Sequence, residues 1–599
     1  MDRALDPDLL REAIGNLGSL PSVEDLATAL ADAEIELLAG RKPSTERLLE
    51  TGWFLFGAGS SHAALEQYGL PRQRAAFRVA AHIFDIALQR SLMDDHDRLE
   101  LCFAAQLAAL RSEINPNATA VYRREFPRGP GNVGLASRVN DLALALGVAL
   151  LATDIRYVFD ATEQLQNELT TLSRSWAIQG FADTVFGAAV DVALACRDLS
   201  LFLIRGEASR LERGEQRLRR AVQSEASRGD IVSRWVAAQL LDFLDGLRSA
   251  SIWTALPPDV PVSVRRAFVL TQPPIVQLWP PQVKLFGIGA NGEFDPFSQD
   301  ARRQLISTPT SGGKTLVAQM LIANHLITTG TSVCYVAPTR SLCHEVRGSL
   351  DRRVRHIGSS SYADLPGGSP LDFSDFFDVA DGPVVEVMTP ERLAHILRTS
   401  PQELLLRFGM FVVDEAHNVG DPARGWTLES SISYIHRATA ETNHKLVLIS
   451  AAIGNRNHFV QWLQSGEANG KILEFHSEWR GPRRLHCLWT TDADFQQEVH
   501  EPAHETRRPR RRVPLRGVLS IRPTSTGRVR HLSTAQIGEL ILRRNKEGRW
   551  IKDGESTPFY RMIIPIVQLL MDQGPVLVIE VTRTEHRSIR TGTRGTAPT

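Results

Sequence analysis

One short segment constrains the fold of this chain most strongly: residues 308–315, which read TPTSGGKT. The strand-like run 303–308 precedes it, and the apolar residues of 316–327 follow it in a helix-like segment. A strand, a glycine-rich loop and a helix in this order form a phosphate-binding loop. Glycine lets the backbone approach an anion, and the first N–H groups of the helix point at it. The alternative is a glycine-rich turn that only caps a helix.

Each residue type in this loop has a predicted role. Lys314 would reach the β- and γ-phosphates of a nucleotide, and the Thr315 hydroxyl would bind Mg²⁺. Thr308 stands where the general pattern has glycine. The candidate nucleotide-binding residues of the loop are Thr308, Pro309, Thr310, Ser311, Gly312, Gly313, Lys314 and Thr315.

A pair of carboxylates follows about 100 residues later, in 410-MFVVDEAHN-418. The apolar residues predict a buried strand that ends at Asp414 and Glu415, and ligand chemistry in parallel sheets takes place at such ends. We predict that Asp414 holds Mg²⁺ and that Glu415 deprotonates an attacking water, so that Glu415, Asp414 and Lys314 are the catalytic candidates. A solvated acidic turn is the alternative, and the phosphate loop argues against it.

The order of strands and helices predicts the fold class of residues 266–480. Short apolar strands alternate there with helical stretches, which favours an α/β lobe with a doubly wound parallel sheet. The strand candidates are 303–308, 332–337, 384–389, 410–415 and 446–451.

Residues 1–265 predict a large all-α domain before this lobe. In 71–91 and 95–113 apolar residues recur at helical spacing, and 176–204 is apolar almost all round, as in a buried helix. A helical solenoid remains an alternative. The proline-rich segment 256–282 marks the expected boundary between the two regions.

The C-terminal region is basic although the whole chain is neutral, with 68 Lys+Arg and 68 Asp+Glu. Residues 480–599 carry 22 Lys+Arg and 12 Asp+Glu, which favours a polyanionic partner. Segment 507–516 holds six arginines and two prolines. It predicts a linker within an irregular basic region, 481–555. No aromatic residue is interleaved for base stacking, so a solvated linker is favoured over a phosphate track.

Residues 556–599 predict a helix at 559–573, a strand at 575–581 and a tail without hydrophobic periodicity. The longest apolar run has eleven residues and a membrane span needs about 20, so no transmembrane helix is expected. Five cysteines without a C-x-x-C pair argue against a zinc ribbon, and Cys334 and Cys343 are better explained as core residues than as ligands. With no signal-peptide core at the N-terminus, we expect a cytoplasmic protein.

Together these motifs resemble superfamily-two nucleic-acid helicases of the DEAD/DEAH-box type, over about residues 273–490. The resemblance implies ATP and Mg²⁺ as cofactors, and it implies that Gln282 in 279-WPPQ-282 reads adenine. It also implies DNA or RNA as the partner, contacted mainly through the backbone of a single strand. The implied contact residues are Pro338, Thr339, Arg340, Thr389, Pro390, Glu391, Arg424 and Gly425.

The resemblance further implies coupling between ATP and the strand through His417, Ser450 and Ala451, with Ala452 where the family has threonine. His417 as a metal ligand is the alternative. The family's second lobe and its arginine finger have no match after Arg480, so we expect the start of a shortened second lobe in 556–599. Two hypotheses follow. The chain is an ATP-dependent helicase or translocase, or it is a scaffold that binds ATP and nucleic acid without productive turnover. A protein partner for the helical region is a further expectation.

Overall fold

The computed structural model separates into two compact units, residues 92–482 and residues 1–91 together with 483–599. Within them it describes residues 45–90, 93–131, 139–175, 187–224, 229–287, 295–309, 312–354, 383–422, 424–451, 453, 455–465, 472–479, 481, 487–493, 499–500, 510–521, 530–545, 547, 549–554 and 556–571. Among the described helices, none combines the length and hydropathy that crossing a bilayer requires.

A six-stranded parallel sheet in the order β3-β2-β4-β5-β1-β6 forms the centre of the α/β lobe. Every position of β1, β2 and β5 is buried, which explains why the apolar residues inside these strands follow one another without alternation. The doubly wound sheet and five of its strands are confirmed. The strands are β1 (Arg303–Ser307), β2 (Ser332–Val336), β3 (Val385–Met388), β4 (Phe408–Val413), β5 (Lys445–Ser450) and β6 (Leu473–His476).

The sequence did not predict β6, because its four residues alternate between buried and exposed and give too short a pattern to separate from a loop. β6 pairs in parallel with β1, so β1 lies between β5 and β6.

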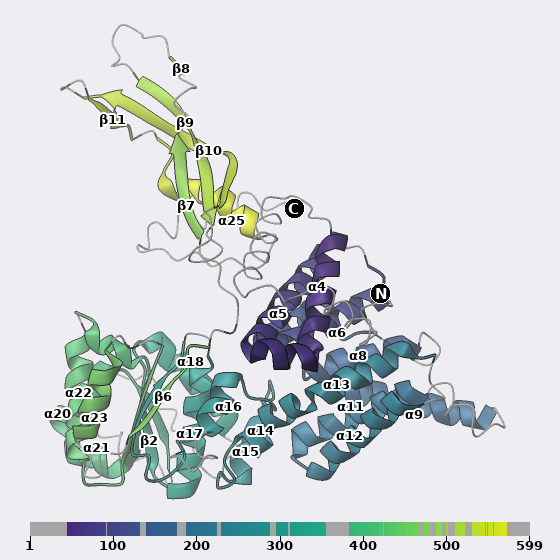
Figure 1. Cartoon of the computed structure of the whole chain (residues 1–599). Coiled ribbons are helices and arrows are strands. Elements are labelled where there is room, and N and C mark those ends of the chain that lie inside the picture. Colours follow the sequence, from purple (N-terminus) through teal and green to yellow (C-terminus); the bar gives the residue numbers. More distant parts are fainter. Residues whose placement is uncertain are drawn as a thin grey trace. The chain divides into compact units, whose positions relative to one another are not determined.

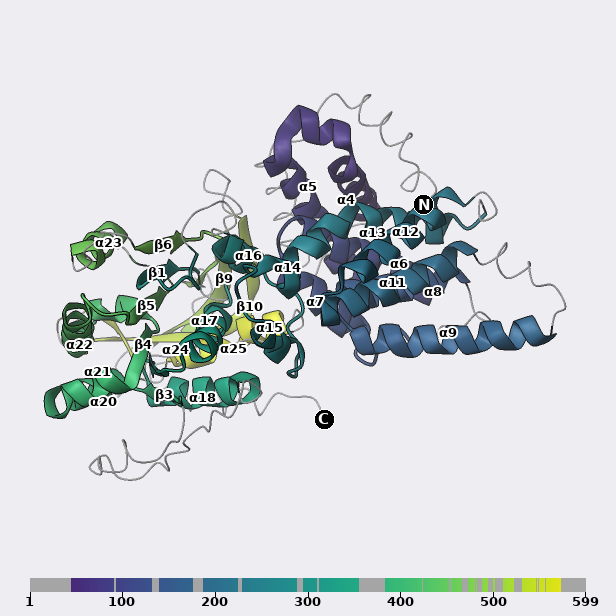
Figure 2. The same cartoon turned by 90° about the horizontal axis from the view of Figure 1, so that it is seen from below.

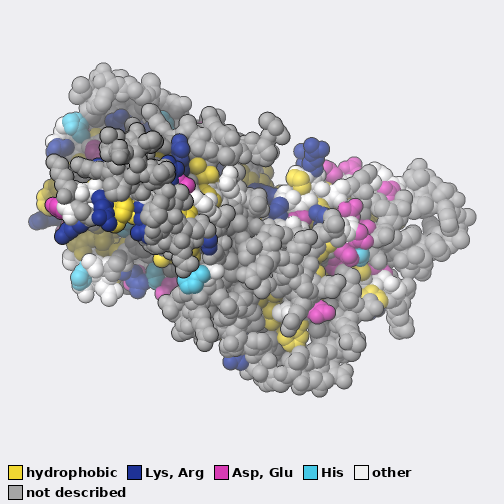
Figure 3. Space-filling view, turned by 90° about the horizontal axis from the view of Figure 1, so that it is seen from above, with side chains coloured by type: hydrophobic (Ala, Val, Ile, Leu, Met, Phe, Trp, Pro, Cys, Tyr) yellow, Lys and Arg dark blue, Asp and Glu magenta, His cyan; other side chains and the backbone are white. Residues whose placement is uncertain are grey.

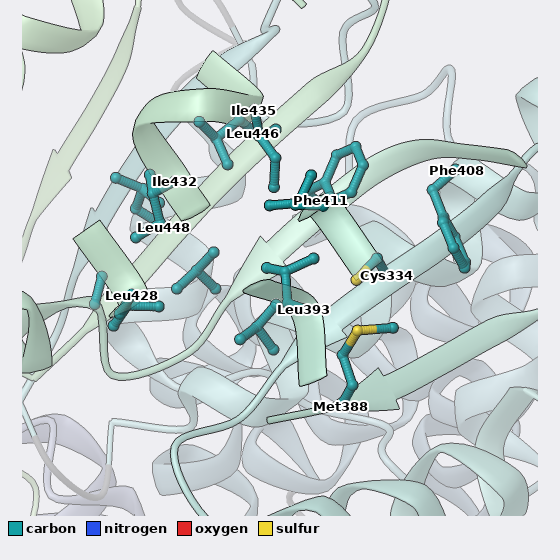
Figure 4. Close-up of a cluster of buried hydrophobic side chains, with 14 of the residues drawn as sticks. Cys334, Met388, Leu393, Phe408, Phe411, Leu428, Ile432, Ile435, Leu446 and Leu448 are labelled. Carbon is teal, nitrogen blue, oxygen red and sulfur yellow. The ribbon is translucent and has the colours of Figure 1, made fainter. Parts of the chain in front are cut away.

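Helices cover both faces of this sheet (Figure 1). They are α17 (Lys314–Thr329), α18 (Arg340–Val354), α20 (Pro390–Thr399), α21 (Pro401–Arg407), α22 (Gly425–Ala438) and α23 (Arg456–Ser465), with the 3-10 helix η2 (Ala416–Gly420) after β4. Apolar side chains of α20 and α22, such as Leu393, Ile432 and Ile435, pack on Phe411 and Leu446 of the sheet (Figure 4). This core fixes the strand ends that carry the candidate site.

The remainder of the same unit is helical. It contains α6 (Asp95–Arg111), α7 (Asn115–Glu125), α8 (Val139–Leu151), α9 (Ile155–Ser175), α11 (Gly187–Arg205), α12 (Ala208–Gln223), α13 (Ile231–Ala250), α14 (Ile252–Ala255), α15 (Val262–Val269) and α16 (Pro280–Phe286). In Figure 2, α6, α8, α11, α12 and α13 lie together as a bundle, and contacts between these helices agree with the view. Asp94 and Asp230 cap α6 and α13 by accepting backbone N–H groups.

The expected boundary at residue 265 falls inside α15, and the helices on both sides belong to one compact unit with the α/β lobe. The proline-rich segment 256–282 holds two helices, because Pro261 precedes α15 and Pro280 opens α16, positions at which proline does not break a helix.

The other unit contains two helices at its N-terminal end and a sheet at its C-terminal end. The helices are α4 (Thr45–Ser60) and α5 (His62–Arg90), and α5 is kinked at Gly69, whose φ is 77°. The sheet is antiparallel, in the order β11-β10-β9-β7, with β8 paired to β9. Its strands are β7 (Cys487–Ala493), β8 (Val499–His500), β9 (Arg510–Ile521), β10 (Arg530–Arg544) and β11 (Trp550–Lys552), and α24 (Phe559–Met562) and α25 (Ile564–Met571) follow.

This sheet corrects the prediction of an irregular linker in 481–555. Residues 510–516 belong to β9, where the buried Val513 and Leu515 alternate with Arg512, Pro514 and Arg516. The arginine density hid this alternation. The helix predicted at 559–573 is confirmed as α24 and α25, while the strand predicted at 575–581 and the tail lie outside the described residues.

Candidate functional site

The predicted phosphate loop connects β1 to α17 at the C-terminal edge of the parallel sheet. The Thr308 N–H donates to the Ser450 carbonyl at the end of β5 (3.0 Å), and the Gly312 N–H donates to the Pro309 carbonyl (3.0 Å). Thr310 and Ser311 lie outside the described residues. The Thr308 hydroxyl is buried and has no hydrogen-bond partner among the described residues. The loop is therefore held by its two ends, with an unsatisfied hydroxyl inside it.

Gly313 occupies the position before α17 that only glycine fits. Its φ is 77°, and a Cβ on it would lie 2.2 Å from the Nε2 atom of Gln282. Gln282 is buried on α16, where its Oε1 accepts the Trp279 N–H (2.8 Å) and its Nε2 donates to the Gly313 carbonyl (3.4 Å). The residue predicted to read adenine therefore lies directly against the phosphate loop.

Lys314 and Glu415 meet at this edge although 101 residues separate them. The Lys314 Nζ atom lies 2.8 Å from Glu415 Oε1, with 10% and 25% of the two side chains exposed. Thr315, the next residue on α17, is exposed. Because β1 and β4 are parallel strands of one sheet, their C-terminal ends bring the lysine of one motif to the carboxylate of the other.

Asp414 is oriented by two hydrogen bonds. Its Oδ2 accepts the hydroxyl of Tyr335 from β2 (2.8 Å), and its Oδ1 accepts the N–H of Glu415 (2.9 Å). Burial raises the pKa of the Asp414 carboxyl above its ordinary value, and the neighbouring Glu415 adds to the rise. The Tyr335 hydrogen bond and the Lys314 ammonium oppose it. The hydrogen bonds from the Tyr335 hydroxyl and the Glu415 N–H therefore favour the charged form of the buried Asp414 carboxylate.

Glu415 adopts the left-handed conformation, with φ of 51°, which is uncommon for a residue other than glycine. Its Oε2 lies 3.2 Å from His417 Nδ1, and the same nitrogen lies 3.0 Å from the Ser450 hydroxyl. Ala451 follows Ser450 at the end of β5, and Ala452 lies outside the described residues. The coupling candidates His417 and Ser450 thus connect the carboxylate to the end of β5.

The predicted strand-contact residues also come together. Pro338, Thr339 and Arg340 follow β2, and Thr389, Pro390 and Glu391 follow β3, its neighbour in the sheet. The Ala337 N–H donates to the Met388 carbonyl (3.0 Å) between these two turns. Arg424, directly before Gly425 and α22, donates from Nε to Glu391 Oε1 (2.7 Å). All three segments therefore lie along one edge of the sheet.

Sequence reasoning missed two polar residues of this lobe. Tyr335 lies in an otherwise apolar strand, and only its hydroxyl, opposite a predicted carboxylate, signals its role. Arg303 is completely buried and donates to His436 in the last turn of α22 and to Thr439, which caps that helix. From the sequence alone, an arginine at the start of a strand does not indicate which residues it bonds to.

The oxygen atoms of Asp414 and Thr315 suit Mg²⁺, which prefers hard oxygen ligands and keeps several waters. The described residues contain no group of three or more His, Cys, Asp or Glu side chains placed to hold a metal by themselves. This donor set fits a metal that is shared with a bound phosphate, as in phosphate-loop enzymes.

Comparison with known proteins finds a family model that matches part of the lobe. Residues 294–459 match the model of the DEAD/DEAH box helicase family. The ATP-dependent DNA helicase Hel308 of Aeropyrum pernix is 32% identical over 178 residues, which is 29% of this chain and 21% of that protein. The Hachiman protein HamB of Bacillus cereus is 29% identical over 238 residues, 38% of this chain and 20% of that protein. The matched part of the chain thus spans about a fifth of these two relatives.

Solved structures with some likeness include the DUF1998 helicase MrfA bound to DNA, with a TM-score of 0.29 and 18% identity, covering 37% of this chain and 30% of that one. Cas3-ATP from T. fusca has a TM-score of 0.25 and 17% identity, covering 81% of this chain and 54% of that one.

Proposed function

We propose that this chain, whose residues 294–459 match the DEAD/DEAH box helicase family, is an ATP-dependent helicase or translocase that acts on a DNA or RNA strand. The observation that carries the proposal is the Lys314–Glu415 ion pair of 2.8 Å at the C-terminal edge of the parallel sheet. It joins the residue suited to bind a terminal phosphate to the residue suited to activate water.

In the proposed reaction, ATP enters at the loop and Lys314 exchanges Glu415 for the β- and γ-phosphate oxygens. Thr315 and Asp414 would hold Mg²⁺, which would neutralise charge on the phosphates. Glu415 is then released to accept a proton from water as the water oxygen attacks the γ-phosphorus. The bond from that phosphorus to the bridging oxygen breaks, and ADP and phosphate leave. Gln282 supports the loop through the Gly313 carbonyl.

The strand would lie along the edge made by Pro338–Arg340, Thr389–Glu391 and Arg424. Two features support this proposal: the turns are adjacent, and Arg424 and Glu391 are both about half exposed. His417 and Ser450, bonded to each other beside Glu415, are the proposed link from hydrolysis to movement along the strand.

Lys314→Ala and Glu415→Gln test the assignment. Loss of the lysine should abolish ATP binding. Glu415→Gln removes the base but keeps the shape, so ATP binding should persist while hydrolysis falls by about 10²–10⁴-fold. Lys284→Ala and Glu429→Gln are matched controls, because both residues are exposed on neighbouring helices and should leave ATP binding and hydrolysis unchanged. Undiminished hydrolysis in Glu415→Gln would contradict the proposed base.

Strand-stimulated phosphate release separates this function from its alternative. A motor should release phosphate faster when a single strand is added, whereas a scaffold should bind ATP and the strand without acceleration. The measurement is phosphate release by the full chain with and without a DNA or RNA oligonucleotide.

A further inference from the structure

The antiparallel sheet of β7–β11 carries most of the basic charge of the C-terminal region. Residues 510–554 contain twelve Lys+Arg and three Asp+Glu, a net charge of +9. Figure 3 shows Lys and Arg side chains (dark blue) grouped on the left of the view. None of the residues proposed for ATP or strand contact belongs to this sheet, so its charge needs a separate explanation.

The strand register sorts these charges onto two faces at the β11 end of the sheet. Arg544 pairs with Trp550, and Leu542 pairs with Lys552, so Arg544, Trp550 and Lys552 share one face, which we call the Trp550 face. Arg543 pairs with Ile551 and therefore lies on the opposite face.

The two faces differ in their carboxylates. On the opposite face, Arg543 lies 3.9 Å from Asp553, and Arg512 lies 3.7 Å from Glu539. On the Trp550 face, neither Arg544 nor Lys552 has a carboxylate within ion-pair distance among the described residues, and both are exposed. The Trp550 face therefore presents positive charge that no described acidic side chain balances.

An exposed aromatic ring lies between these cations. Trp550 keeps 38% of its surface exposed, and the Arg544 guanidinium lies 5.2 Å from the centre of its ring. The turn before it is closed by Asn545, whose side chain accepts the N–H groups of Glu547 (3.0 Å) and Arg549 (2.8 Å). Trp550 and Arg544 are thus held in place before any ligand arrives, which lowers the entropy lost on binding.

We propose that the Trp550 face binds a nucleic-acid single strand, with Arg544 and Lys552 against its phosphates and the indole of Trp550 against a base. Charge complementarity favours a polyanion, and the ring favours one with unpaired bases, because a base needs a free face to stack. This second anchor goes beyond the proposed motor function, since it needs neither ATP nor the edge of the parallel sheet.

The test is fluorescence anisotropy of the full chain with labelled oligothymidylate and oligouridylate, without nucleotide, over a series of salt concentrations. Trp550→Ala should weaken binding about 5- to 100-fold, the range found for loss of one base stack, whereas Trp550→Phe should retain most of the affinity. Arg544→Gln should lower the slope of log affinity against log salt by about 0.7, the value for one phosphate contact of a single strand. The two oligonucleotides show which kind of strand is bound.

Arg543→Gln is the matched control, because it removes the same charge one residue away on the opposite face. Arg543→Gln should change the slope of log affinity against log salt by less than half of the change expected for Arg544→Gln. Equal slopes for the two arginine variants, or unchanged binding in Trp550→Ala, would overturn the proposal, as would the absence of binding to both oligonucleotides. The assay contains no nucleotide, so its outcome does not depend on whether the ATPase assignment is correct.

Discussion

Replacing Tyr335 with Phe tests whether the buried hydroxyl keeps Asp414 charged. Tyr335 is 1% exposed, and its hydroxyl lies 2.8 Å from Asp414 Oδ2. A hydrogen bond to a charged group contributes about 1.5–3 kcal/mol, so the free energy of unfolding of this unit should fall by that amount near neutral pH. The pKa of Asp414, already raised by burial, should rise further.

The sign of the pH dependence follows from this pKa. The folded-state pKa of Asp414 lies above its unfolded value, so the folded state binds the proton more tightly, and stability falls as pH rises between the two values. Tyr335→Phe raises the folded-state pKa and widens that window. Below the unfolded pKa the carboxyl is neutral, and the missing bond is an ordinary one of about 1 kcal/mol. The loss of stability should therefore be larger near neutral pH than at about pH 3.

Tyr122 provides a matched control in the same compact unit. It is 4% exposed, and its hydroxyl donates to Asp154 Oδ2 at the same distance of 2.8 Å. Urea unfolding followed by circular dichroism should show similar losses for Tyr122→Phe and Tyr335→Phe. Only Tyr335→Phe should raise the Mg²⁺ concentration needed for half-maximal ATP hydrolysis. If the two variants show the same Mg²⁺ dependence, Tyr335 is a structural residue and the reasoning fails.

Three further predictions concern other parts of the unit and the sheet. Gly313→Ala should weaken ATP binding, because its Cβ displaces Gln282, whereas Gly330→Ala at the other end of α17 has a similar φ of 67° and open space, and should leave ATP affinity unchanged. Arg303→Met should lower the free energy of unfolding by about 3 kcal/mol in urea titrations, because several buried acceptors lose their donor, and a loss below about 1 kcal/mol would refute this. A thiol reagent should label one of the five cysteines quickly in the folded chain, Cys487, because the other four are buried, and rapid labelling of two or more would contradict the burial.

The α/β lobe was predictable because its strands are buried on both faces. Residues 332–337 and 446–451 are apolar except for Ser332 and Ser450, and β2 and β5 occupy these positions to within one residue. The encounter of Lys314 with Glu415 followed from the rule that parallel strands end at one edge. The exposed edge strand β6 gave no comparable signal.

The basic sheet was not predictable by the same means. Six arginines between 507 and 516 outweigh Val513 and Leu515, so the alternation of β9 appears as a charged linker. The absence of an aromatic residue in 507–516 argued against strand binding by this segment. The aromatic residue that we propose stacks on a base, Trp550, lies about 40 residues further along the chain. Only the pairing of β10 with β9 and β11 brings Trp550 to the arginines.

The position of β1 between β5 and β6 has a consequence for synthesis on the ribosome. β1 leaves the ribosome before either neighbour, and its first partner, Leu446 opposite Arg303, follows about 140 residues later. At 5–20 residues per second, this strand waits roughly 7–30 s with both edges open. All five residues of β1 are buried in the folded sheet, so the nascent chain exposes a segment that can aggregate throughout that interval. The order of strands that assembles the site therefore also makes β1 the strand that waits longest for a partner during synthesis.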